Sequence, residues 1–133
     1  MTINSARILV VDDQFGNRDS LETFLQREGY ITESAGTGEH ALRLVAQRAP
    51  DLILLDITLP GVDGFEVARR LKSDPATAAI PIIMVTAHTS GSARMVGLEA
   101  GAEDYLTKPF NPSELALKVR NLLRLKASTQ ATD

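Results

Sequence analysis

The stretch RILVVDD (residues 7–13) joins a short apolar run to two acidic residues. Short continuous runs rich in Val, Ile and Leu are typical of strands that are buried on both faces, as in a parallel sheet covered by helices. The same arrangement recurs in LILLD (52–56), IPIIMVT (80–86) and YLTK (105–108), and ITESA (31–35) has a weaker strand pattern. The sequence therefore predicts five parallel strands.

Between these runs the apolar residues change to a helical spacing, and Gly or Pro closes most of the segments. The predicted helices carry, in order, Leu21, Phe24 and Leu25; Ala41, Leu44 and Val45; Phe65, Val67, Ala68 and Leu71; Ala93, Val96, Gly97 and Ala100; and Leu115, Val119, Leu122 and Leu123. Strand and helix alternate five times. This order favours right-handed βαβ units and a doubly wound α/β sheet.

Length and composition limit the classes of protein that need to be considered. A chain of 133 residues with 44% apolar residues has the size and the core of one domain. Its formal charge of −3 and its scattered basic residues argue against direct nucleic-acid binding. No run approaches the ~18 apolar residues of a membrane span, and no signal sequence opens the chain. There is no cysteine for a disulfide or a thiolate metal site. We expect a cytoplasmic protein.

Polar residues end four of the predicted strands: Asp12 and Asp13, Asp56, Thr86, and Lys108. In open parallel sheets, ligands bind beyond the carboxyl ends of the strands, where the strand order reverses. Three carboxylates at one edge repel each other unless a cation lies between them, and Mg²⁺ prefers such oxygen ligands. The set predicts a phosphorylation site that uses a divalent ion, although a single Asp at such a position is equally consistent with a helix cap.

Four motifs carry a family resemblance: VVDD (10–13), LLDITLPGVDG (54–64), MVTA (84–87) and YLTKPF (105–110). In this order the chain resembles the receiver domain of bacterial two-component response regulators, the CheY-like superfamily. The resemblance implies a flavodoxin-like (βα)5 three-layer sandwich with strand order 2-1-3-4-5. We expect the domain at residues 1–126, followed by a polar tail or truncated linker at 127–133.

The resemblance also implies a role for each residue at the predicted site. Asp56 is the expected phosphoacceptor, and Lys108 supplies positive charge to the phosphoryl group. Asp13, Asp56 and the backbone carbonyl of Thr58 are the expected direct ligands of Mg²⁺ (or Mn²⁺), while Asp12 acts largely through water. A cis peptide bond before Pro109 is typical of the family, and the sequence leaves that geometry open.

The predicted switch consists of Thr86 and Tyr105, in which the aromatic ring changes position as the threonine moves. A structural threonine and a static, half-buried tyrosine are the alternatives for these two residues. The switch would alter the surface of the fourth helix, fifth strand and fifth helix, where Met95 and Leu98 are candidate partner contacts.

Two positions, Thr58 and His88, are expected to tune the lifetime of the phosphorylated state. Neither is an acidic or amide side chain that would orient an attacking water, so we expect slow to moderate loss of phosphate. Because histidine titrates at about pH 6.5, His88 would add pH sensitivity, unless it simply faces solvent. We expect His40 to be a surface residue.

The implied function is a signalling switch that catalyses only its own phosphorylation and dephosphorylation. Its expected partners are a sensor histidine kinase or histidine phosphotransfer protein and a downstream target or output domain, with a phosphorylation-linked homodimer as a further possibility. The alternative is a phosphorylation-independent, protein-binding pseudo-receiver. A flavin-binding protein needs a phosphate-cradling loop where DDQFGN (12–17) stands, and a haloacid-dehalogenase-like phosphatase needs a DxD arrangement after the first strand.

Overall fold

The computed structural model describes residues 6–87 and 91–131, which form a single parallel sheet flanked by helices. The strands are β1 (Arg7–Val11), β2 (Ile31–Ala35), β3 (Leu52–Leu55), β4 (Ile82–Thr86) and β5 (Asp104–Thr107). The helices are α1 (Phe15–Arg27), α2 (Gly38–Gln47), α3 (Gly64–Ser73), α4 (Gly91–Glu99) and α5 (Pro112–Ala131). The sheet order is β2-β1-β3-β4-β5, which confirms the predicted flavodoxin-like fold.

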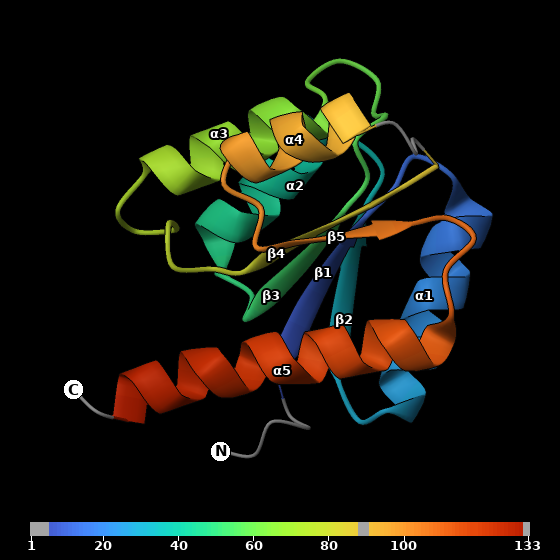
Figure 1. Cartoon of the computed structure of the whole chain (residues 1–133), viewed down its shortest axis with the longest axis vertical. Coiled ribbons are helices and arrows are strands. Elements are labelled where there is room, and N and C mark those ends of the chain that lie inside the picture. Colours follow the sequence, from blue (N-terminus) through green and yellow to red (C-terminus); the bar gives the residue numbers. More distant parts are fainter. Residues whose placement is uncertain (1–5, 88–90, 132–133) are drawn as a thin grey trace.

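Helices cover both faces of the sheet, as the continuous apolar strands require (Figure 1). On one face α1 and α5 pack through a cluster that includes Leu25 and Leu115, and on the other α2, α3 and α4 lie over a cluster that includes Val45 and Val67. All four residues of β3 are buried because both clusters meet this central strand. The three layers of the predicted sandwich are therefore present.

The strand order reverses between β1 and β3, since β2 lies on one side of β1 and β3 on the other. Val11 pairs with both Ala35 and Leu55, and the Asp56 amide donates to the Val11 carbonyl at 2.9 Å. This register places Asp12 and Asp56 side by side at the switch point of the sheet.

The weak strand pattern of ITESA has a structural reason, because β2 is an edge strand. Ile31 is exposed and only Ala35 of this strand is buried. At the other end of the chain, α5 continues to Ala131, through much of the segment that we expected to be a polar tail. The domain boundary at residue 126 stays a prediction.

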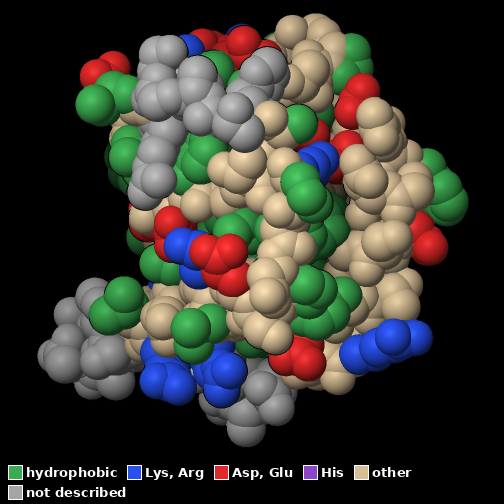
Figure 2. Space-filling view, turned by 45° about the vertical axis from the view of Figure 1, so that its right-hand side comes forward, with side chains coloured by type: hydrophobic (Ala, Val, Ile, Leu, Met, Phe, Trp, Pro, Cys, Tyr) green, Lys and Arg blue, Asp and Glu red, His purple; other side chains and the backbone are tan. Residues whose placement is uncertain are grey.

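Charged side chains of both signs are distributed over the surface. On the face drawn in Figure 2, basic side chains form separate small groups with acidic ones between them, as the sequence suggested. Within the described part of the chain, no helix is long and apolar enough to cross a membrane.

Candidate functional site

Two buried carboxylates lie at the carboxyl edge of the sheet. Asp12 follows β1 and is 2% exposed, and Asp56 follows β3 and is 8% exposed. Burying carboxylates is costly unless they find hydrogen-bond donors or cations. These two carboxylates, which directly follow β1 and β3, therefore need partners that offset the cost of their burial.

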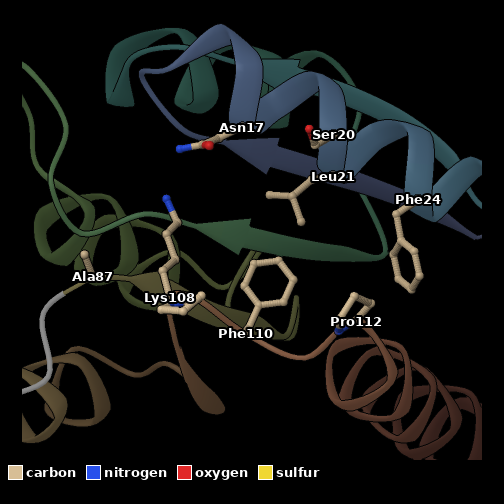
Figure 3. A pocket seen from close by; sticks show the side chains of 9 residues that line it. Asn17, Ser20, Leu21, Phe24, Ala87, Lys108, Phe110 and Pro112 are labelled. Atoms are coloured by element: carbon tan, nitrogen blue, oxygen red, sulfur yellow. The ribbon is translucent and has the colours of Figure 1, made fainter.

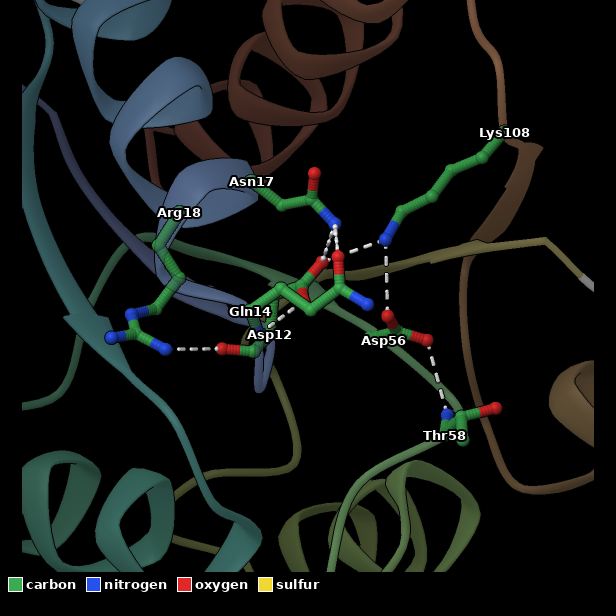
Figure 4. A network of polar contacts seen from close by, with 7 residues as sticks. All are labelled: Asp12, Gln14, Asn17, Arg18, Asp56, Thr58 and Lys108. Carbon is green, nitrogen blue, oxygen red and sulfur yellow. Dashed lines mark hydrogen bonds and ion pairs between the residues drawn. The ribbon is translucent and has the colours of Figure 1, made fainter.

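Lys108, which follows β5, provides part of that compensation (Figure 4). Its Nζ donates to Asp12 Oδ2 at 2.6 Å and to Asp56 Oδ2 at 3.1 Å. The lysine backbone amide also donates to the Thr86 carbonyl at 2.7 Å, and the bond between Lys108 and Pro109 is cis. The structure thus brings together Asp12, Asp56 and Lys108, as the sequence predicted.

Asp13 completes an acidic group with Asp12 and Asp56, in which one carboxylate oxygen of each residue lies within 4.8 Å of the others. Asp13 is exposed, unlike the other two. Three hard carboxylate ligands at this spacing, with one side open to solvent, suit Mg²⁺, which binds through a few carboxylates and keeps several waters. The donor set therefore fits the predicted metal.

Asp12 is held by further residues that our reading of the sequence missed. The Gln14 amide donates to Asp12 Oδ1 at 2.9 Å, and Asn17 Nδ2 lies 3.4 Å from Oδ2. The Arg18 guanidinium donates to the Asp12 backbone carbonyl at 2.8 Å. These residues lie at the start of the helix that directly follows the acidic pair, and this position was a sequence signal for a role near the site. Their individual partners could not be predicted, because those depend on how the helix is oriented.

The loop after β3 holds Asp56 in place. The Thr58 amide donates to Asp56 Oδ1 at 3.0 Å. Gly64 begins α3 directly against this loop, where a Cβ would lie only 2.2 Å from the Asp56 carbonyl oxygen. Gly64 is therefore required by close packing of backbone beneath the site, a role that its place in the LLDITLPGVDG motif did not reveal.

Burial and charge both affect the ionisation of Asp56 and Lys108. Desolvation by burial raises the pKa of Asp56, and the charge of Asp12 adds to this effect, while the Thr58 amide and Lys108 lower it by less. Burial alone would lower the pKa of Lys108, but the hydrogen bonds and charges of Asp12 and Asp56 outweigh it and raise that pKa. Negative charge is thus in excess around a lysine that stays protonated.

The expected switch residues occupy the neighbouring strands. Thr86 ends β4 and is 1% exposed, while Tyr105 in β5 is buried, packed in the core cluster on the α4 side of the sheet. Met95 and Leu98 on α4 are exposed, as a partner surface would require. The proposed lifetime residue His88 lies outside the described residues.

An open pocket of about 580 Å³ adjoins the site between α1 and the segment after β5. Lys108 and Asn17 lie at its end nearest the carboxylates, and Leu21, Phe24 and Phe110 provide apolar walls (Figure 3). The lysine that contacts Asp56 is therefore also part of an accessible, largely apolar depression.

Comparisons with known proteins agree with this fold and site. The family model for the response regulator receiver domain matches residues 8–120. The response regulator PleD of Caulobacter vibrioides is 48% identical over 122 residues, which are 92% of this chain and 27% of PleD. The chain spans between about a quarter and a half of the length of the curated relatives it matches.

Solved structures give the same result. A putative response regulator from Chloroflexus aurantiacus is 41% identical, with a TM-score of 0.87 over 90% of this chain and 98% of that one. The receiver domain of the sensor histidine kinase PA1611 from Pseudomonas aeruginosa, solved with magnesium coordinated in its active-site cleft, is 32% identical with a TM-score of 0.83 over 90% and 98% of the two chains. The chain belongs to the response regulator receiver domain family, whose members are signalling switches.

Proposed function

We propose that this chain is a phosphoacceptor switch in which Asp56 receives a phosphoryl group. The observation that carries the proposal is the contact of Lys108 Nζ with Asp56 Oδ2 at 3.1 Å, inside a group of three carboxylates at the switch point of the sheet. The lysine is placed to stabilise charge on the oxygens of a group attached to Asp56. A solely structural ion pair would not require the two additional carboxylates.

Asp12, Asp13 and Asp56, with the backbone carbonyl of Thr58, are the proposed holders of Mg²⁺ (or Mn²⁺). When bound, the ion supplies positive charge that offsets the carboxylates and the oxygens of the incoming phosphoryl group. Asp13 is the exposed member of the set and Asp12 is the most enclosed by protein donors. This difference supports direct binding by Asp13 and an indirect role for Asp12.

In the proposed reaction, an Asp56 carboxylate oxygen attacks phosphorus and forms a new P–O bond. The bond between phosphorus and the donor breaks, and the donor leaves with that electron pair. Phosphoryl transfer of this kind depends mainly on positioning and electrostatic stabilisation. The Thr58 amide orients the carboxylate through Oδ1, and Lys108 stabilises the transferred oxygens.

Phosphorylation would bias the equilibrium of the α4-β5-α5 surface through Thr86 and Tyr105. The buried ring of Tyr105 lies close to α4, because a Cβ added at Gly97 would be 3.7 Å from its Cδ2 atom. A movement of this ring would therefore alter the packing beneath Met95 and Leu98. Thr58 and His88 are the proposed determinants of phosphate lifetime.

The proposed phosphate donor is a sensor histidine kinase or a histidine phosphotransfer protein. The open pocket beside Lys108 supports this proposal because it offers a donor protein an accessible, largely apolar surface next to the lysine that contacts Asp56. The phosphorylated chain would then act on a downstream target, on an output domain or on a second copy of itself. The greater length of the curated relatives makes an attached output domain a reasonable candidate.

Intact-mass spectrometry after incubation with acetyl phosphate and MgCl₂ tests the proposal. We expect one added phosphate on the wild-type chain, with none on Asp56→Asn and none when EDTA replaces Mg²⁺. An added phosphate on Asp56→Asn would show that another residue is the phosphate acceptor. A wild-type chain that stays unmodified with both acetyl phosphate and a phosphorylated histidine phosphotransfer protein would favour a phosphorylation-independent binding module.

A further inference from the structure

Arg18 contacts the acidic group from the side opposite Lys108 (Figure 4). Its Nη1 atom donates to the Asp12 backbone carbonyl at 2.8 Å, whereas Lys108 Nζ donates to the Asp12 carboxylate. The Asp12 amide in turn donates to the Ala35 carbonyl of β2 at 3.1 Å. The backbone of Asp12 is thus held at both its amide and its carbonyl.

The Asp12 carbonyl belongs to the peptide group that links Asp12 to Asp13. Because a peptide group is planar, fixing the direction of its carbonyl also fixes the plane through which the chain reaches the Asp13 Cα. The hydrogen bond from Arg18 therefore restrains the position of the Asp13 Cα, and with it the set of directions in which the Asp13 side chain can leave the backbone.

Asp13 needs such a restraint more than its two neighbours do. Donors hold the carboxylates of Asp12 and Asp56 directly. Among the side chains and backbone that the structure describes, no hydrogen bond or ion pair holds the exposed carboxylate of Asp13. We infer that Arg18 is a positioning residue, which orients Asp13 toward Asp12 and Asp56 for divalent-cation binding. This inference rests on the proposed metal site.

Two neighbours, the Phe15 ring and the backbone of Gly36, border the Arg18 guanidinium. Its Cζ atom lies 5.6 Å from the centre of the Phe15 ring, within the range of a cation–π contact. Gly36 leaves room for it, since a Cβ at that position would lie 3.0 Å from Arg18 Nη1. Gly36 has no positive φ, so alanine is compatible with its backbone. Gly36→Ala therefore offers a way to displace the guanidinium without changing Arg18.

The inference predicts that removing Arg18 changes Mg²⁺ affinity in the direction opposite to the one expected from the charge of Arg18 alone. Arg18 carries positive charge near a proposed Mg²⁺ site, so its removal would by charge alone strengthen cation binding. If Arg18 orients Asp13, its removal weakens binding instead. Loss of an outer residue that orients a metal ligand typically lowers metal affinity about 10- to 100-fold. We expect about 10-fold for Arg18→Met, because Asp12 and Asp56 keep their own donors.

Titration of the ¹⁵N-labelled chain with MgCl₂, followed by two-dimensional NMR, measures the Mg²⁺ dissociation constant and verifies the fold of each variant. The comparison includes wild type, Arg18→Met, Gly36→Ala and the double variant. Arg27→Met is the matched control, because it removes the same charge from the exposed last turn of the same helix. We expect weaker binding in Arg18→Met, a smaller loss in Gly36→Ala, no further loss in the double variant, and an unchanged constant in Arg27→Met.

Unchanged or tighter Mg²⁺ binding in Arg18→Met, with normal binding in wild type, would overturn the positioning role and leave the proposed function intact. Additive losses in the double variant would also overturn it, because Gly36→Ala would then act independently of Arg18. A wild-type chain that binds no Mg²⁺ would overturn both this inference and the proposed metal site.

Discussion

Two largely buried lysines lie at opposite ends of the same pair of strands. Lys72, 15% exposed, donates to the carbonyls of Ala78 and Ile80 and to the Glu103 carboxylate near the start of β4 and β5. Lys108, 21% exposed, follows β5 and contacts the carboxylates of Asp12 and Asp56. Each lysine joins segments that are distant in sequence, but the two networks differ in the number of carboxylates that contact the ammonium group.

The charge around Lys72 is balanced by one carboxylate, and the other oxygen of Glu103 accepts from the Ile82 amide at 2.7 Å. Around Lys108, one ammonium group faces two buried carboxylates with a third nearby. Burial next to this excess charge raises the pKa of Asp56. The comparison indicates that the first network stabilises the fold by itself, while the second is adapted to receive additional positive charge.

The largest expected effect on stability is that of Lys72→Met. This change leaves Glu103 without its cation and deprives the carbonyls of Ala78 and Ile80 of a donor, so we expect a loss of about 2–4 kcal/mol. Urea denaturation measures it, with Lys118→Met as the control, because Lys118 is more exposed than Lys72 and its pair with Asp104 should contribute less than about 1 kcal/mol. Equal losses of stability in Lys72→Met and Lys118→Met would contradict the stabilising role that we assign to the Lys72 network.

Lys108→Met should be less destabilising, by about 1–2 kcal/mol without metal, because the buried carboxylates it leaves keep the backbone amides of Gln14 and Thr58 as donors. We expect Mg²⁺ to stabilise this variant more than it stabilises wild type. The folded pKa of Lys108 lies above the ordinary value of 10.5, so its contribution is complete below that pH and disappears as the pH rises through the folded pKa. If the difference in stability between Lys108→Met and wild type already decreases near neutral pH, the raised pKa assigned to Lys108 is contradicted.

A smaller effect of the opposite sign is expected for Asp56→Asn. The pKa of Asp56 is raised in the folded state, so its contribution to stability is greatest below the ordinary value of 3.8 and is lost as the pH rises through the folded pKa. In EDTA at neutral pH the variant should therefore be more stable than wild type, by less than either lysine loss. Thermal unfolding at a series of pH values tests this, and a gain that grows on acidification would be inconsistent with it.

The sequence predicted the fold because its signals are local and repeated. RILVV, LILL and IIMVT are mostly apolar runs, and each forms a largely buried strand that ends at, or directly before, a predicted site residue. β2 was the weakest prediction, since an edge strand buries little. The positions of Asp12, Asp56 and Lys108 followed from the rule that the carboxyl ends of parallel strands meet at one edge.

Contacts that depend on packing between helices and strands could not be predicted from local sequence patterns. Nothing local distinguishes Lys72 from a solvated lysine, because its acceptors lie in the loop before β4 and in the segment before β5. Arg18 likewise has the appearance of an ordinary helix residue until α1 is placed against the end of β1. The cis geometry at Pro109 and the burial of Tyr105 also depend on the assembled structure.

The most direct test of the excess negative charge beside Lys108 is the Mg²⁺ dependence of the free energy of unfolding. A ligand that binds only the folded state stabilises it in proportion to RT ln(1 + [L]/Kd), so urea denaturation with and without saturating MgCl₂ measures the coupling. We predict that Mg²⁺ stabilises wild type and Lys72→Met by similar amounts and has little effect on Asp56→Asn or Asp13→Asn. An equal gain in all four proteins, or none in wild type, would contradict a cation site at this end of the sheet.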